Sequence, residues 1–93
     1  MIHYVPPTMS VTSTAYCLPG VMADGSNVRS GSVAMNLVPL GRRIKLLSRR
    51  FHGRRNFTVR DRIGWGTQLD FWASDCGDAL RWGRKTVRLR VVG

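Results

Sequence analysis

The segment Ser74-Asp-Cys-Gly-Asp-Ala-Leu-Arg-Trp-Gly-Arg-Lys-Thr-Val-Arg-Leu-Arg-Val91 carries the clearest structural signals in the chain. Ser74 or Asp75 can cap the start of a helix, and Gly83 can end it. The pattern therefore predicts one short helix over residues 74–83. Apolar residues and arginines then alternate over residues 87–91, and this period of two is typical of a half-buried strand with a basic outer face. The C-terminal part of the chain therefore predicts a helix followed by a strand.

Short runs of β-branched, aromatic and apolar residues, separated by turns rich in glycine and proline, predict further strands earlier in the chain. The candidates are residues 11–17, 33–36, 44–47, 57–61 and 69–72. Ninety-three residues can bury only one core. We therefore predict an all-β fold, a small barrel over residues 10–93, preceded by an extended, proline-containing arm at residues 1–9.

The charge of the chain is strongly positive: fifteen Arg and Lys residues oppose five Asp, for a formal net charge of +10. Such a surface attracts anionic partners, whether nucleic acid, acidic lipid or an anionic cell-wall polymer, and says nothing about the fold. No apolar run approaches the roughly 20 residues that span a bilayer. The N-terminal residues lack the pattern of a signal peptide, so we expect another component to deliver the chain if its target lies outside the cytoplasm.

Cys17 and Cys76 are too few for a disulfide framework and lack the spacing of a metal site. A bridge between them can form if the fold brings them together, but the sequence favours two buried, unpaired thiols. With only two histidines, no zinc site is expected. The sequence therefore predicts neither a metal nor another cofactor.

Acidic residues are scarce, so their positions are informative. Asp61 ends one predicted strand and Asp70 lies inside the next, with a glycine-containing loop between them. Two such carboxylates can converge on one groove, where burial or a neighbouring charge keeps one of them protonated. On pattern alone, a simpler interpretation is favoured, in which both acids pair with the abundant arginines.

Several motifs, read in order, resemble the three-aspartate (3D) family of peptidoglycan lytic transglycosylases. These motifs are Thr14-Ala-Tyr-Cys17, Ala23-Asp-Gly-Ser-Asn-Val-Arg-Ser-Gly-Ser-Val-Ala34, Val38-Pro-Leu-Gly41, Asp61, Leu69-Asp-Phe71 and Ala79-Leu-Arg-Trp-Gly-Arg-Lys-Thr-Val87. The family is similar to the catalytic barrel of membrane-bound lytic transglycosylase A and, more distantly, to rare lipoprotein A. The resemblance covers about residues 12–92 and implies a six-stranded double-psi β-barrel.

The resemblance also implies an activity and roles for individual residues. Asp70 matches the aspartate that acts as the acid, Asp61 matches the second aspartate, and Asn36 stands where the first is expected. The implied reaction cleaves the bond between N-acetylmuramic acid and N-acetylglucosamine and closes a 1,6-anhydro ring on the muramyl sugar. Asn36 can orient the sugar by hydrogen bonds, Tyr16 can flank the groove or simply pack, and Trp65 can stack on a sugar face.

Two other classes of function remain open. A basic nucleic-acid-binding barrel is the first, because paired arginines between residues 42 and 55 accompany Phe51 and Phe57, which can stack on bases. The second is a non-catalytic wall-binding or virion (tail) structural domain, favoured by Asn36 in place of an aspartate. A lone domain of this kind suits a bacteriophage product that works with other virion or lysis proteins at the bacterial wall or in the periplasm, delivered in the virion or after lysis.

Overall fold

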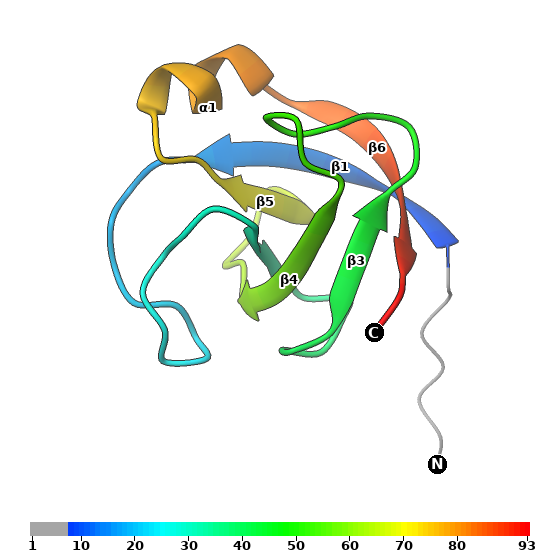
Figure 1. The fold of residues 1–93 in the computed structure, drawn as a ribbon, viewed down its shortest axis with the longest axis horizontal. Helices are drawn as coiled ribbons and strands as arrows, with labels where there is room; N and C mark the ends of the chain where they lie inside the picture. The colour runs from blue at the N-terminus through cyan, green and yellow to red at the C-terminus, as the bar shows by residue number, and fades with distance from the viewer. Residues whose placement is uncertain (1–7) are drawn as a thin grey trace.

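All the predicted strands form in the computed structural model, which describes residues 8–93 (Figure 1). The elements are β1 Thr8–Tyr16, β2 Ser32–Met35, β3 Arg43–Leu46, β4 Asn56–Asp61, β5 Leu69–Trp72, α1 Cys76–Trp82 and β6 Lys85–Val91. The predicted all-β barrel with one short helix near the C-terminus is therefore confirmed. Residues 1–7 of the predicted arm lie outside the described residues. The last two residues of the arm, 8 and 9, belong to β1, which begins at Thr8.

The six strands close into a barrel in the order β1-β5-β2-β4-β3-β6. β1 pairs in parallel with β5 and β2 in parallel with β4, whereas the other four pairings are antiparallel. Consecutive strands β4 and β5 lie on either side of β2, and β5 and β6 lie on either side of β1. These crossovers agree with the double-psi arrangement that the resemblance implied.

Side chains alternate between the barrel core and its outer face along the strands. In β5, Leu69 and Phe71 are buried in the core, so Asp70 and Trp72 between and after them face outward. In β6, Val87 and Leu89 are buried while the arginines beside them are exposed, as the period of two predicted. A core made of these inward residues leaves the carboxylate of Asp70 on the outer surface of the barrel.

The helix begins and ends close to its predicted limits. Asp75 caps it by accepting a hydrogen bond from the backbone N–H of Gly77, and Gly83 ends it with a φ of 66°. Trp82 packs against the core, and its ring N–H donates to the hydroxyl of Ser13. α1 therefore covers one end of the barrel, and no helix within residues 8–93 has the length and apolarity to cross a bilayer.

The nucleic-acid alternative expects Phe51, in the arginine-rich segment 49–55, to be free to stack on bases, and this is wrong. Phe51 and Arg54 exchange two backbone hydrogen bonds, which makes the segment a tight hairpin. This hairpin directs Phe51 inward, where it is 5% exposed and stacks on Phe71 with ring centroids 4.5 Å apart. Phe57 is buried in the same cluster. Neither ring is therefore available to stack on nucleic-acid bases.

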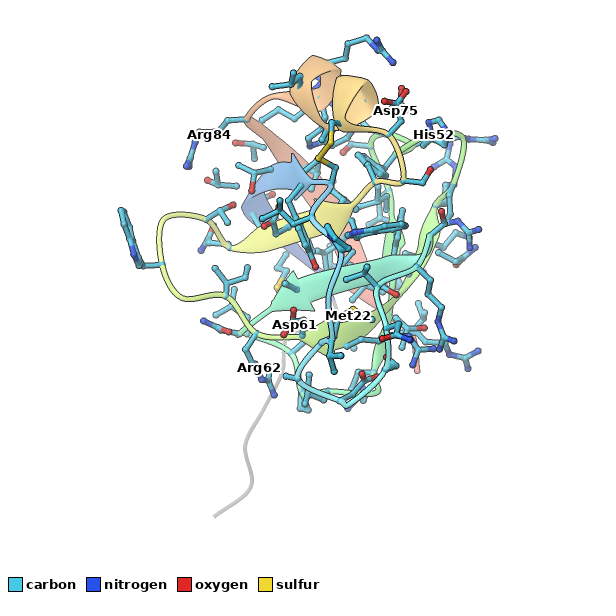
Figure 2. The ribbon with its side chains drawn as sticks, turned by 90° about the vertical axis from the view of Figure 1, so that its left-hand side faces the viewer. Met22, His52, Asp61, Arg62, Asp75 and Arg84 are labelled. Carbon is cyan, nitrogen blue, oxygen red and sulfur yellow. A yellow bond between two sulfur atoms is a disulfide. The ribbon has the colours of Figure 1, made fainter. Side chains whose placement is uncertain are left out.

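The two cysteines form a disulfide, so the prediction of unpaired thiols is wrong. The Cα atoms of Cys17 and Cys76 lie 5.0 Å apart although 59 positions separate them in sequence. The reason is topological: parallel pairing brings the ends of β1 and β5 together, and α1 starts shortly after β5. Figure 2 shows the bond directly beneath α1. It ties the end of β1 to the start of the helix.

Candidate active site

The two predicted acids lie on one row that crosses adjacent strands of the barrel. Ala34 of β2 is paired with Asp61 of β4 on one side and with Asp70 of β5 on the other. Thr14 of β1 is paired with Asp70 and continues the row. Since neighbouring strands lie about 4.8 Å apart, the backbones of the two aspartates are roughly 10 Å apart. Ala34, with only a methyl group, leaves open space between the two carboxylates.

A shift of register in β4 places Asp61 in this row. Val59 is buried in the core, so simple alternation would direct Asp61, two residues further on, inward as well. Instead Val33 is paired with Val59 but Ala34 is paired with Asp61, so β4 accommodates one extra residue. Bulges of this kind re-aim a side chain and are common beside functional sites. The bulge therefore gives Asp61 its place on the outer face.

The carboxylate of Asp61 holds the backbone of two segments together. Its Oδ1 accepts hydrogen bonds from the backbone N–H of Ala23 and from that of Arg62, each at 2.9 Å. Ala23 belongs to the long β1–β2 connection, which Figure 2 shows crossing the outer face near Asp61, with Met22 beside it. Asp61 thus anchors this connection to the end of β4.

Asp70 has different surroundings. It is half-buried on β5, and its Oδ1 accepts a hydrogen bond of 3.1 Å from the hydroxyl of Thr14. Burial raises the pKa of the Asp70 carboxyl, and the hydrogen bond from Thr14 opposes this only in part. A carboxyl group with a raised pKa is suited to donating a proton.

Tyr16 lies two residues after Thr14 on the same face of β1 and lines the same groove. Burial, followed by the negative charges of Asp61 and Asp70, raises the pKa of its hydroxyl to about 12. Tyr16 therefore remains protonated at neutral pH and can donate a hydrogen bond to a bound ligand. Tyr16 therefore lies close enough to both acids for their charges to disfavour its ionised form.

These side chains line an open groove of about 380 Å³. Ala34, Asp61 and Asp70 form its floor. One wall is the β4–β5 loop, residues 62–68, which contributes Arg62, Ile63, Gly64, Trp65 and Thr67. The Trp65 side chain is 92% exposed, so its ring is available to stack on a ligand. The structure thus brings Tyr16 and Trp65 to the same groove as Asp61 and Asp70.

Asn36 has a supporting position instead of a place on the groove floor. Its side-chain amide donates to the carbonyl of Ile63 at 2.7 Å and accepts from the backbone N–H of Ile63 at 2.9 Å. Arg62 strengthens this attachment by donating to the carbonyls of Met35 and Val38. Both hydrogen-bonding groups of Asn36 are used to hold the loop that carries Trp65. Asn36 therefore positions the wall of the groove.

The ion-pairing alternative for the two acids is wrong in the described residues. The acid-base pairs within residues 8–93 are Asp24 with Arg60, Asp78 with Arg81, and Asp78 with His52. Asp61 and Asp70 bind backbone amides and a hydroxyl instead. No group of three His, Cys, Asp or Glu side chains in this part of the chain is arranged to hold a metal ion. The groove offers acid and hydrogen-bonding chemistry.

Sequence reasoning missed Thr14 and Ala34, which complete the row. The signal for Thr14 was its spacing of two from Tyr16, which places both on one face of a strand. The pairing of β1 with β5 and of β2 with β4 and β5 was not visible, because it joins segments far apart in sequence. The chain matches no protein-family model and no curated protein. A functional assignment therefore depends on the geometry of the groove.

Proposed function

We propose that this protein is a peptidoglycan lytic transglycosylase in which Asp70 acts first as acid and then as base. The observation that carries the proposal is the contrast within the acidic row: a half-buried Asp70 with a raised pKa faces Asp61 across Ala34 in an open groove. This arrangement leaves one carboxyl group able to donate a proton and keeps a second negative charge nearby. The motif order that resembles the 3D family supports the same reaction.

In the first step Asp70 protonates the oxygen between N-acetylmuramic acid and N-acetylglucosamine. The C1–O4 bond breaks, the proton remains on the leaving sugar, and positive charge develops on the muramyl ring. The carboxylate of Asp61 and the newly formed carboxylate of Asp70 are then both negative and stabilise this charge. The Tyr16 hydroxyl can donate a hydrogen bond, and Trp65 can stack on a sugar ring.

In the second step the muramyl 6-hydroxyl attacks C1 of the same sugar. An O6–C1 bond forms, and the proton of the hydroxyl returns to Asp70, which regenerates the acid. No water enters the product. This differs from two-carboxylate hydrolysis, in which the second acid activates water or serves as the nucleophile. Asp70 thus serves as the acid in the first step and as the base in the second.

The disulfide and the charge of the chain suit the site of action that this function requires. Disulfides persist in oxidising environments such as the bacterial periplasm and outside the cell, and Cys17 and Cys76 are paired. A formal net charge of +10 increases attraction to the anionic wall. Both features support the proposal that the activity lies at the bacterial wall or in the periplasm.

A non-catalytic wall-binding or virion structural domain is the second candidate. The observation that favours it is that Asp61 anchors the β1–β2 connection and Asn36 anchors the groove wall. Two of the three positions that correspond to the family's aspartates thus hold neighbouring segments in place. Under this alternative the groove binds glycan without cleaving it.

The experiment that separates these candidates is product analysis in isotopically labelled water. Purified sacculi are incubated with the protein in H₂¹⁸O, and soluble muropeptides are analysed by mass spectrometry. The proposed reaction releases 1,6-anhydro products without ¹⁸O, whereas hydrolysis adds one ¹⁸O atom at the new reducing end. Sedimentation with sacculi and no soluble product at any pH would instead support the binding domain.

A further inference from the structure

A second groove, of about 270 Å³, lies on the outer face of the barrel beside the acidic one. Arginine side chains from four separate segments line it: Arg29, Arg43, Arg54 and Arg60. Asp24 neutralises Arg60 through a contact of 3.1 Å, while the other three arginines are absent from the acid-base pairs within residues 8–93. The groove therefore concentrates uncompensated positive charge.

Ser32 of β2 also lines this groove, and its hydroxyl is buried without a hydrogen-bond partner among the described residues. The residue is 1% exposed. An unsatisfied buried hydroxyl costs free energy, so native structures seldom retain one without a reason. A ligand oxygen entering the groove would supply the missing acceptor.

Arg54 lies at the edge of this groove beside Gly31. Its guanidinium lies against Gly31, where a side-chain carbon would approach Arg54 Nη1 to 2.8 Å, and Gly31 has a φ of +90°. The positive φ favours glycine at this point, and a side chain there would displace the guanidinium of Arg54. Forked guanidinium groups together with a hydroxyl donor are suited to recognising a carboxylate or phosphate.

The two grooves share β2 as their floor. Ser32 lines the basic groove and Ala34, two residues along the same face of the strand, lines the acidic one. In β4 the corresponding neighbours are Arg60 and Asp61. Two residues of extended chain span about 7 Å, which is the distance between successive outward positions on a strand. A ligand that fills the acidic groove can therefore reach the basic groove with a short extended arm.

We propose that the basic groove binds a carboxylate of the peptide stem attached to the muramyl sugar in the acidic groove. The inference rests on the proposed function, because it assumes that peptidoglycan occupies the acidic groove. The acidic peptide stem extends from the muramyl ring, so it can span the short distance between the acidic groove and the basic groove. The guanidinium groups and the Ser32 hydroxyl would then select stem-bearing glycan over bare glycan.

Binding of defined soluble ligands tests this proposal without depending on turnover. Isothermal titration is carried out with a disaccharide that carries its peptide stem, the same disaccharide without the stem, and inorganic phosphate. The stem should increase affinity at least tenfold. The double variant Arg29→Gln/Arg43→Gln should abolish that gain, and Ser32→Ala should reduce it. Binding of the stem-free disaccharide should stay unchanged in both.

The matched control is Arg49→Gln/Arg50→Gln, which removes the same charge from exposed positions outside the groove. An equal loss in this control, or no gain from the stem in the unaltered protein, would overturn the proposal. Phosphate that competes with the stem-bearing ligand at similar affinity would also overturn it and indicate a phosphate-bearing polymer. Stem-dependent binding without any anhydro product would mean that the proposed reaction fails while stem recognition stands.

Discussion

Asp61 and Asp70 occupy the same row of the barrel, but their surroundings differ. Asp61 accepts two backbone N–H groups at a bulge, and these contacts bind the β1–β2 connection to β4. Asp70 lies on a regular strand, accepts one hydroxyl from Thr14, and its pKa is raised by burial. The two carboxylates therefore differ in their hydrogen-bond donors and in their burial. Backbone contacts favour a structural carboxylate, and partial burial with few donors favours a proton donor.

The largest expected effect is on turnover, and it separates the two acids directly. Asp70→Asn keeps the shape and the Thr14 hydrogen bond but cannot donate a proton to the leaving oxygen. Positioned general acids typically contribute about 10²- to 10⁴-fold in rate, so release of 1,6-anhydromuropeptides should fall at least a hundredfold. Asp61→Asn is the matched control and should reduce the rate by less than about tenfold. Equal losses in both variants would contradict the division of roles.

The next largest effect is the loss of stability on removing the disulfide. Cys17 directly follows β1, which pairs with the Asp70 strand β5, so the bond lies on the Asp70 side of the site. Cys17→Ser/Cys76→Ser opens a loop of 59 positions, and chain entropy then predicts a loss of up to about 4 kcal/mol in the free energy of unfolding. Urea denaturation of the oxidised protein and the variant measures this. A loss below about 1 kcal/mol would show that the pairing of β1 with β5 holds this side without the covalent link.

The order of elements was readable from the sequence, and the assembly of the site only in part. Alternation over residues 87–91 and the cap at Asp75 report local backbone geometry, so β6 and α1 were predicted correctly. The bulge that turns Asp61 outward depends on pairing between β2 and β4, and no local pattern encodes it. The disulfide escaped prediction for the same reason. Phe51 was misassigned because its arginine neighbours hid a hairpin that directs the ring inward.

A smaller effect tests the structural role of Asp61. Asp61→Ala leaves the backbone N–H groups of Ala23 and Arg62 without their carboxylate acceptor. Both sites are near solvent, so water partly replaces the lost bonds and the expected destabilisation is about 1–2 kcal/mol. Hydrogen exchange should increase at Ala23 and its neighbours more than in β1 or β5. Unchanged exchange at Ala23 would mean that Asp61 does not anchor the connection.

The smallest effect is the dependence of stability on pH at Asp70. Because burial raises the pKa of the folded-state carboxyl above its unfolded value of about 3.9, the folded protein holds this proton more tightly than the unfolded chain does. The contribution of Asp70 to stability is therefore fully present below the unfolded pKa and is lost as pH rises through the folded pKa.

Asp70→Asn removes this titration, so its stability relative to the unaltered protein should be highest near pH 7 and should decline as the pH falls toward 4. The difference should stay below about 1 kcal/mol, because the carboxyl is only half-buried and solvent screens part of the effect. Urea denaturation at pH 7, 5.5 and 4 measures it. Asp61→Asn removes the same charge from the same groove, so the contrast between the two pH profiles isolates the burial of Asp70 from the general repulsion of a basic protein. A relative stability of Asp70→Asn that rises on acidification would reverse the sign and show that Asp70 is stabilised as a carboxylate, which would remove the physical basis for its role as the acid.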